Sequence, residues 1–196
     1  SHRWQGYIPF DEMPELLNPE CEWIRTANNR TAANDFPHML SGCWSSGHRA
    51  VRIRQMLESQ LEPFTFDDFV RMQNDVISGR AVECAPKLVN VLTSVEDSHV
   101  QEARARLANW DGAMQLESVA GSIFNVFFTL WQTRVAQEHI PAEQIELIGP
   151  ACGGIASRLI DGDPLGWFND DNQRTAVIET FYQTLQVLTE RFGDDQ

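Results

Sequence analysis

One apolar stretch constrains the fold of this 196-residue chain more than any other feature of its sequence. Residues 117 to 138 have helical periodicity, and from Val119 to Trp131 the predicted helix is apolar on nearly every side. A helix that is apolar all round must be covered all round, and thirteen residues are too few to cross a bilayer. The stretch therefore predicts the central helix of a helical core.

Helical patterns continue on both sides of this stretch, from about residue 45 to the end of the chain. The other predicted helices cover residues 45 to 61, 66 to 92, a stretch that begins at Ser94 or Ser98 and ends at the turn 109–112, residues 141 to 160, and residues 172 to 192. Ser45 or Ser46 is suited to cap the first of these, and Thr65 with Asp68 has the spacing of a capping box. Pro86 is expected to kink or split the helix that contains it. The pattern predicts a mainly α fold, an orthogonal assembly of six or seven helices.

Residues 1–45 differ in character from the rest. GYIPF at 6–10 and EWIRTA at 22–27 predict two short strands joined by a proline-rich loop, and a polar loop, ANNRTAANDFP, follows them. Two short strands do not make a stable sheet alone, so they need a partner sheet or must lie on the helices. We therefore expect two domains, a strand-and-loop segment at 1–45 and a helical domain at 46–196.

Composition restricts the class of partner. The chain carries 15 basic and 28 acidic residues, a net charge of −13, and Lys87 is its single lysine. Neutralising phosphates requires clustered Lys and Arg, so the balance argues against nucleic acid. The hydrophobic fraction of 42% is sufficient for a real core. No signal peptide and no apolar run of membrane length is found in the sequence.

Metal and disulfide chemistry have little support in the sequence. The four cysteines, at positions 21, 43, 84 and 152, are widely spaced without a C-x-x-C pair, and the histidines form no H-x-x-x-H or H-E-x-x-H pattern. We therefore predict no metal site and no cofactor. A disulfide between two of the cysteines and buried free thiols remain equal alternatives.

Two features are candidates for catalytic chemistry. Ser1 is an N-terminal serine that can use its own α-amine as a base, although no flanking residue supplies an oxyanion hole. Asn28 and Asn29 end the second predicted strand, and an Asn amide is a neutral donor that stabilises a developing oxyanion. Asn also favours turns and left-handed backbone, and local sequence alone favours that second interpretation.

Several motifs in order resemble the penicillin acylase (penicillin amidase) family of N-terminal-nucleophile hydrolases. The motifs are GYIPFDEMPELLNPECEWIRTANNR, the FP at 36–37, the segment from Trp44 to Arg49, FDDFVRMQNDVIS, and the LANWDG turn. They stand in the order and near the spacing of the family from Trp4 to Gly112, and the later helices fit in general character. The resemblance implies a parent enzyme that hydrolyses the amide bond of N-acylated small molecules, of penicillin or acyl-homoserine lactone type.

The resemblance also implies roles for two residues of this chain. The first Asn of the matching pair donates its side-chain amide to the oxyanion in this family, which assigns that role to Asn28. An Arg that follows by about twenty residues lines the site, and Arg49 is the best match; a surface salt bridge is the alternative for Arg49. Calcium is bound by some members, but the matching position falls near His38 to Leu40, where Asp35 is a weak substitute.

The resemblance places other parts of the enzyme outside this chain. The family's serine nucleophile lies far upstream of the Asn pair, whereas Ser1 is 27 positions away and lacks the usual following Asn. The chain is therefore expected to be an inactive internal fragment of the large (β) subunit, cut from an αββα core. Its expected partners are the remainder of that core, the small (α) subunit and the substrate, in a periplasmic or secreted bacterial parent. The rival hypothesis is a non-catalytic acidic helical module for binding or assembly.

Overall fold

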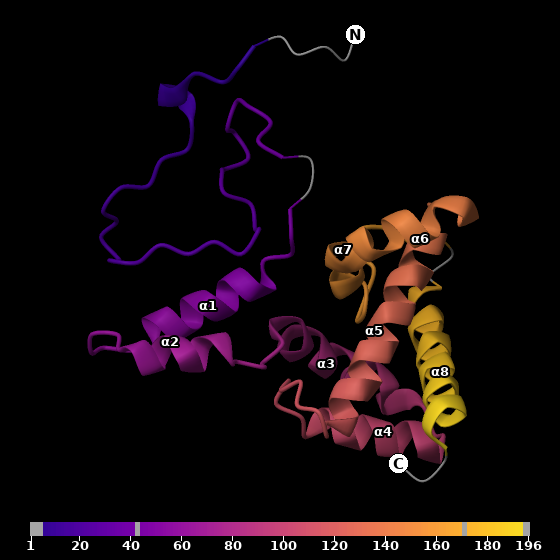
Figure 1. Ribbon diagram of the computed structural model, residues 1–196. Coiled ribbons are helices and arrows are strands. Elements are labelled where there is room, and N and C mark those ends of the chain that lie inside the picture. The colour runs from indigo at the N-terminus through magenta and orange to yellow at the C-terminus, as the bar shows by residue number, and fades with distance from the viewer. Residues whose placement is uncertain (1–5, 42–43, 170–171, 194–196) are drawn as a thin grey trace. The chain divides into compact units, whose positions relative to one another are not determined.

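The computed structural model describes residues 6–41, 44–169 and 172–193. The chain divides into two compact units, residues 1–73 and residues 74–196, each described below by itself (Figure 1). Most described residues of the second unit are helical, which confirms the predicted mainly α class. The sequence instead predicted an edge segment of a catalytic core at 1–45 and a helical insertion domain at 46–196, and that functional division stays a prediction.

The second unit is built around α5, the predicted central helix, which runs from Val119 to Gln137. The other helices of the unit are α3 (Gly79–Val91), α4 (Ser98–Ala108), α6 (Ile145–Ile148), α7 (Gly153–Arg158) and α8 (Gln173–Phe192), with short 3-10 turns η2 (Leu92–Ser94), η3 (Ala142–Gln144) and η4 (Gly149–Cys152). Helix α5 lies beside α8 and also packs against α4, α7 and η4 (Figure 1). Helices therefore cover α5 on several sides, as its apolar sequence requires.

Aromatic side chains fill the core along α5. Phe127 and Trp131 are fully buried and stack on each other, with ring centroids 6.4 Å apart. Trp131 also stacks on Phe168 at 5.6 Å, and its indole Nε1 donates a hydrogen bond to the carbonyl of Ala156 at 2.9 Å. The apolar burial and the satisfied indole together fix α5 against α7 and the chain that follows it.

The turn after α7 is fixed by one carboxylate. Asp163 accepts hydrogen bonds from the backbone N–H groups of Trp167 at 2.9 Å and Phe168 at 2.7 Å. Partial burial raises the pKa of Asp163, but the backbone hydrogen bonds outweigh it and lower the pKa overall. Trp167 Nε1 donates to the carbonyl of Val135 at 2.9 Å, so the turn is tied to the end of α5.

The first unit has few buried apolar side chains. Its regular elements are the 3-10 turn η1 (Phe10–Glu12) and the helices α1 (His48–Glu58) and α2 (Phe66–Gln73). Its buried hydrophobic residues are Ala27, Ala50 and Leu57. The exposed large hydrophobic residues are Tyr7, Phe10, Met13, Leu16, Leu17, Ile24, Met39, Val51, Leu61, Phe66, Phe69 and Val70. An apolar surface of this kind is normally covered by another part of a protein.

The two strands predicted at 6–10 and 22–27 are not formed. The described residues of the first unit contain no strand, and Phe10 belongs to η1 instead. Extended segments need a neighbouring strand to satisfy their backbone groups, and two short ones do not provide it for each other. That part of the prediction is wrong for this structure.

The helix predicted from 66 to 92 is interrupted before Pro86 rather than at it. Helix α2 ends at Gln73 and α3 begins at Gly79, with Pro86 inside α3. Between them, Ser78 donates its backbone N–H to the carbonyl of Gly112 and caps α3 by accepting from the N–H of Ala81. Gly112 has φ +86°, and a Cβ there would lie 2.8 Å from Val82 Cγ2. Pairing with this glycine turn therefore breaks the helix at a place that periodicity alone does not mark.

Of the predicted helix caps, the one at Thr65 and Asp68 is formed and the one at Ser45 or Ser46 is not. Asp68 and Thr65 form the reciprocal capping box: the Thr65 N–H donates to Asp68 Oδ2 at 2.6 Å, and the Asp68 N–H donates to Thr65 Oγ1 at 3.4 Å. Ser45 and Ser46 do not cap α1, because its N-cap is Gly47. The N-cap of α4 is Asp97, which accepts from the N–H groups of His99 and Val100. The helix itself begins at Ser98, one of the two predicted starts.

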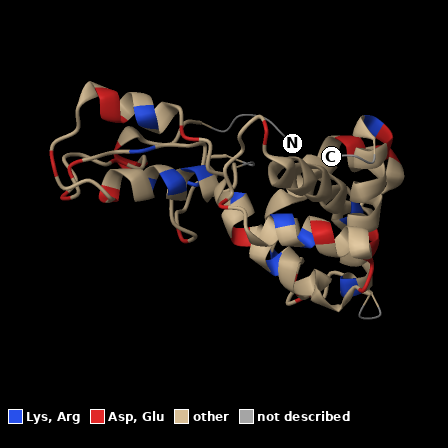
Figure 2. Ribbon diagram, turned by 90° about the horizontal axis from the view of Figure 1, so that it is seen from below, with Lys and Arg blue, Asp and Glu red and all other residues tan. Residues whose placement is uncertain are grey.

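Charges are dispersed over the chain. Figure 2 shows Lys and Arg on several separate helices, with Asp and Glu interspersed among them. Among the described residues, no helix is both long and apolar enough to span a membrane.

Candidate active site

Asn28 lies at a bend that follows the irregular segment from Trp23 to Thr26. Its φ is +56°, the left-handed region that Asn tolerates better than most residues. The backbone N–H of Ser45 donates to the Asn28 carbonyl at 2.8 Å. The preceding residue, Ala27, is buried, whereas Asn28 itself is exposed. The turn therefore holds the backbone of Asn28 and presents its side chain outward.

Arg49 contacts the same turn from the first turn of α1. Its Nη2 donates to the carbonyl of Ala27 at 3.0 Å and to the side-chain Oδ1 of Asn28 at 2.8 Å. The two residues that the sequence singled out, 21 positions apart, are thus direct neighbours. No ion pair of Arg49 is recorded with any described acidic residue, so the salt-bridge alternative has no support in this structure.

The contact with Arg49 decides which way the Asn28 amide faces. A guanidinium has donors only, so the oxygen of the amide must face it. The Asn28 amide nitrogen then points away from Arg49, and no acceptor for it is recorded among residues 6–41 and 44–73. Its N–H groups are therefore available to an oxygen that is not part of the described chain.

Asn29 has a different role from Asn28. Its Oδ1 accepts from the Ala27 N–H at 3.3 Å, and its Nδ2 donates to the carbonyl of Arg30 at 2.8 Å. Both ends of its amide thus serve the turn. The turn interpretation fits both residues, because Asn28 has the left-handed backbone of the turn and the Asn29 side chain holds it, but the Asn28 amide nitrogen has no recorded acceptor among the described residues.

The loop that follows Asn28 in sequence lines an open pocket. The loop leaves Asn28, and Ser45 closes it by its hydrogen bond to the Asn28 carbonyl. Its pocket has a volume of about 270 Å³ and is lined by Arg30, Ala32, Ala33, Phe36, Pro37, His38, Met39, Leu40, Ser41 and Trp44. Sites for whole drug-sized ligands are usually larger. The sequence assigned Ser45 to a helix cap and gave no sign that it closes this loop.

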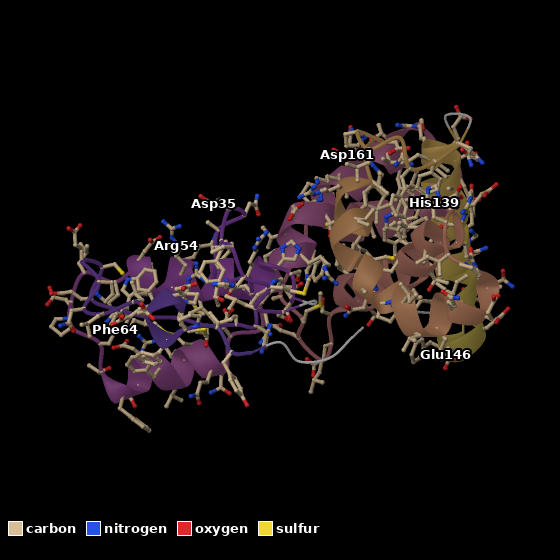
Figure 3. All side chains as sticks on the ribbon, turned by 90° about the horizontal axis from the view of Figure 1, so that it is seen from above. Asp35, Arg54, Phe64, His139, Glu146 and Asp161 are labelled. Carbon is tan, nitrogen blue, oxygen red and sulfur yellow. The ribbon has the colours of Figure 1, made fainter. Side chains whose placement is uncertain are left out.

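The position that the family resemblance suggested for a calcium ligand lies near His38 to Leu40. His38 Nε2 lies 2.5 Å from a carboxylate oxygen of Glu12, and Asp35 is exposed on its loop (Figure 3). Within the described ranges, no group of three or more His, Cys, Asp or Glu side chains is arranged to hold a metal ion. We derive no chemical step through calcium.

The other nucleophilic side chains have no recorded contact with Asn28 or lie outside the described residues. Ser1 and Cys43 are outside them. Cys21, Cys84 and Cys152 are free thiols, and burial raises the pKa of Cys84 to about 11. A thiol that stays protonated at neutral pH is a poor nucleophile, so Cys84 is a packing residue of the core.

Two comparisons with known proteins point to the same family. A sequence model of the family described as penicillin amidase matches residues 1–196. The penicillin acylase 2 proenzyme of Pseudomonas sp. (strain SE83) is 33% identical over 127 residues, which cover 65% of this chain and 16% of that protein. The acyl-homoserine lactone acylase QuiP of Pseudomonas aeruginosa is 27% identical over 165 residues, covering 76% of this chain and 18% of that protein. The chain thus spans less than a fifth of the length of these relatives.

Proposed function

The chain belongs to the penicillin amidase family, and from this premise we propose that it is part of an enzyme that hydrolyses the amide bond of N-acylated small molecules. Asn28 is the oxyanion donor of that enzyme, and Arg49 holds its amide in place. The observation that carries the proposal is the hydrogen bond from Arg49 to Asn28 Oδ1, which leaves the amide N–H groups free.

The chemistry explains why such a donor is useful. Attack on an amide carbonyl places negative charge on the carbonyl oxygen in the tetrahedral intermediate. A donor that is already oriented stabilises this charge without reorganising during the reaction. Arg49 supplies the orientation because it binds Oδ1, and Asn28 remains neutral, so it can approach the substrate carbonyl before charge develops.

The nucleophile comes from another part of the parent enzyme in this proposal. An N-terminal serine Oγ attacks the carbonyl while its own α-amine takes the hydroxyl proton and passes it to the leaving amine. Water then hydrolyses the acyl ester. One relative is named a proenzyme, which supports a precursor that is cut to expose such a serine. The remainder of the catalytic core and a small subunit are then the partners of this chain.

The substrate class follows from the relatives' names. A penicillin and an acyl-homoserine lactone both carry an acyl group on the amino group of a small ring. The pocket lined by the loop after Asn28 is large enough for one part of such a molecule. We place the parent enzyme in the periplasm or outside a bacterial cell, where N-acylated small molecules from other organisms are met.

Replacing Asn28 in the complete enzyme tests the proposal. We expect Asn28→Ala to lower kcat for an N-acyl substrate by roughly 10²- to 10³-fold, with KM little changed, because the donor acts mainly in the transition state. Asn34→Ala is the control, since Asn34 is an exposed Asn of the same loop whose recorded contact is with Arg30. A variant at Asn28 that keeps the wild-type kcat would contradict the proposal.

A further inference from the structure

We propose that the exposed apolar face of α2 is a docking surface for another segment of the parent enzyme, one that lies outside these 196 residues and carries a basic residue beside its apolar side chains. The inference rests on the proposed larger enzyme and not on the role proposed for Asn28. The docking surface, the α2 patch, consists of Leu61, Phe64, Phe66, Phe69 and Val70.

Helix α2 turns its apolar side outward. Phe66, Phe69 and Val70 stand at positions i, i+3 and i+4, which share one face of a helix. Phe66 is 82% exposed, Phe69 and Val70 are exposed as well, and Leu61 in the preceding loop is 98% exposed. The residue that α2 buries is instead a carboxylate, Asp68. Because a surface helix normally packs its apolar stripe on a core, the outward stripe of α2 indicates a partner on that side.

The α2 patch is already ordered before a partner binds. Phe64, in the loop before α2, contacts Phe69 with ring centroids 5.6 Å apart (Figure 3). Three hydrogen bonds to Asp68 Oδ2 hold this loop on the helix, from Gln60 Nε2 at 3.1 Å, the Thr65 N–H at 2.6 Å and the Thr65 hydroxyl at 2.6 Å. A surface fixed in this way loses little conformational entropy on binding, which favours docking.

The charges beside the α2 patch are acidic. Glu62 and Asp67 are exposed carboxylates, and each is next in sequence to a residue of the patch. The arginines nearest to the patch in sequence, Arg54 and Arg71, each form an ion pair within their own helix. A Lys or Arg beside the apolar residues of the partner would therefore meet an opposite charge, which favours a basic partner and fixes its register.

The same charges argue against a second copy of this chain as the partner. The chain has a net charge of −13, and a symmetric dimer through this face would bring two acidic patches together. Like charges across an interface oppose binding. The matched relatives are much longer proteins, of which the chain covers 16% and 18%. Other segments of a parent of that length are held near the patch at high effective concentration, so they are the favoured partner.

Hydroxyl-radical footprinting tests the proposal, because it reports the exposure of individual side chains. Oxidation of Leu61, Phe66 and Phe69 is followed by mass spectrometry in the 196-residue chain and in the complete enzyme. The fully buried Phe127 is the internal reference. We expect the three patch residues to be oxidised roughly tenfold or more slowly in the complete enzyme, because the partner excludes water from them there. Phe127 should react slowly in both.

Amide hydrogen exchange of residues 61–73 then tests which side chains bind the partner. In the complete enzyme, Phe66→Ala should raise exchange there roughly tenfold or more, whereas in the 196-residue chain it should change exchange little. Leu17→Ala is the control, since Leu17 is 75% exposed but is not part of the patch, and it should have no effect on these residues. Asp67→Asn should raise exchange by a smaller factor that shrinks at high salt.

The proposal is overturned if the patch is oxidised equally fast in the complete enzyme and in the 196-residue chain. It is also overturned if protection appears in the chain alone and rises with its concentration, which would identify a second copy as the partner. Protection that appears in the enzyme only when an N-acyl substrate is added would overturn it as well. A failure of the proposed function is distinguishable, because Asn28→Ala then keeps full activity while the patch is still protected in the complete enzyme.

Discussion

Trp131 of α5 is fully buried, whereas Phe66 of α2 is 82% exposed, and the two side chains represent the units to which they belong. Residues 74–196 have a continuous core of aromatic and aliphatic side chains around α5. Among the described residues of 6–41 and 44–73, only Ala27, Ala50 and Leu57 are buried hydrophobic residues. The candidate catalytic residues, Asn28 and Arg49, lie in residues 6–73, which have little core.

The difference shows how the two units depend on their surroundings. The helical unit buries a continuous apolar core of its own and so can define its own structure. The unit with Asn28 holds its turn by hydrogen bonds, from Arg49 and Ser45, and leaves its large apolar side chains uncovered. It follows that residues 6–73 leave apolar surface that they do not cover themselves, whereas the helical unit has a core of its own.

The largest expected effect is on the core of the helical unit. Replacing Trp131 with alanine removes a buried ring stacked on Phe168 and a hydrogen bond to Ala156. We expect the free energy of unfolding to fall by about 3–5 kcal/mol. Phe66→Ala should change it by less than about 0.5 kcal/mol. Urea unfolding followed by circular dichroism measures both, and equal losses would contradict the contrast between the units.

The next largest effect concerns the contact that holds Asn28. In the complete enzyme, Arg49→Met leaves Asn28 Oδ1 without its donor, so the amide is free to rotate. We expect kcat to fall roughly 10- to 100-fold, because small misplacements of a catalytic group are costly. Arg54→Met is the matched control on the same helix, since Arg54 pairs only with Glu58 one turn later. Loss of activity in both variants would show that α1 as a whole, and not this contact, matters.

The smallest expected effect is on the pH dependence of stability, which should differ between two carboxylates, Asp68 and Asp163. A hydrogen bond from the Thr65 hydroxyl is the main cause that holds the pKa of Asp68 well below its usual range, and backbone hydrogen bonds lower the pKa of Asp163. Each contributes stability above the unfolded pKa of about 3.9 and loses it as the pH falls through the folded value.

Asp163→Asn should therefore lower the urea midpoint at about pH 6, with a smaller difference at about pH 3. Asp68→Asn should leave the midpoint of the helical unit unchanged at either pH, because the stability that Asp68 contributes belongs to α2 and to the other unit. A shift of the midpoint by Asp68→Asn as large as that by Asp163→Asn would contradict this difference.

The sequence predicted the helical unit well where periodicity carries the information. The apolar run around Phe127 and Trp131 predicted α5 as the central helix, and Thr65 with Asp68 predicted a cap that the structure confirms. It failed at the break between α2 and α3. That break depends on pairing with Gly112, more than thirty residues later, which no local pattern reveals.

For the candidate site, the family resemblance identified two residues, but the sequence did not predict how they contact each other. Resemblance to the family singled out Asn28 and Arg49, and the structure adds that they are hydrogen-bonded, which no spacing argument provides. The two predicted strands failed for a different reason. A strand is defined by its partner, and residues 6–10 and 22–27 have the composition of strands without a neighbouring strand to pair with.

Amide hydrogen exchange of the 196-residue chain tests the contrast between the units most directly. We predict that the slowest amides lie in α5 and α8, exchanging only through global unfolding, and that α1, α2 and the turn at Asn28 exchange orders of magnitude faster. Protection in α1 and α2 equal to that in α5 would contradict the account, because it would show that residues 6–73 are stable without any other part of the parent enzyme.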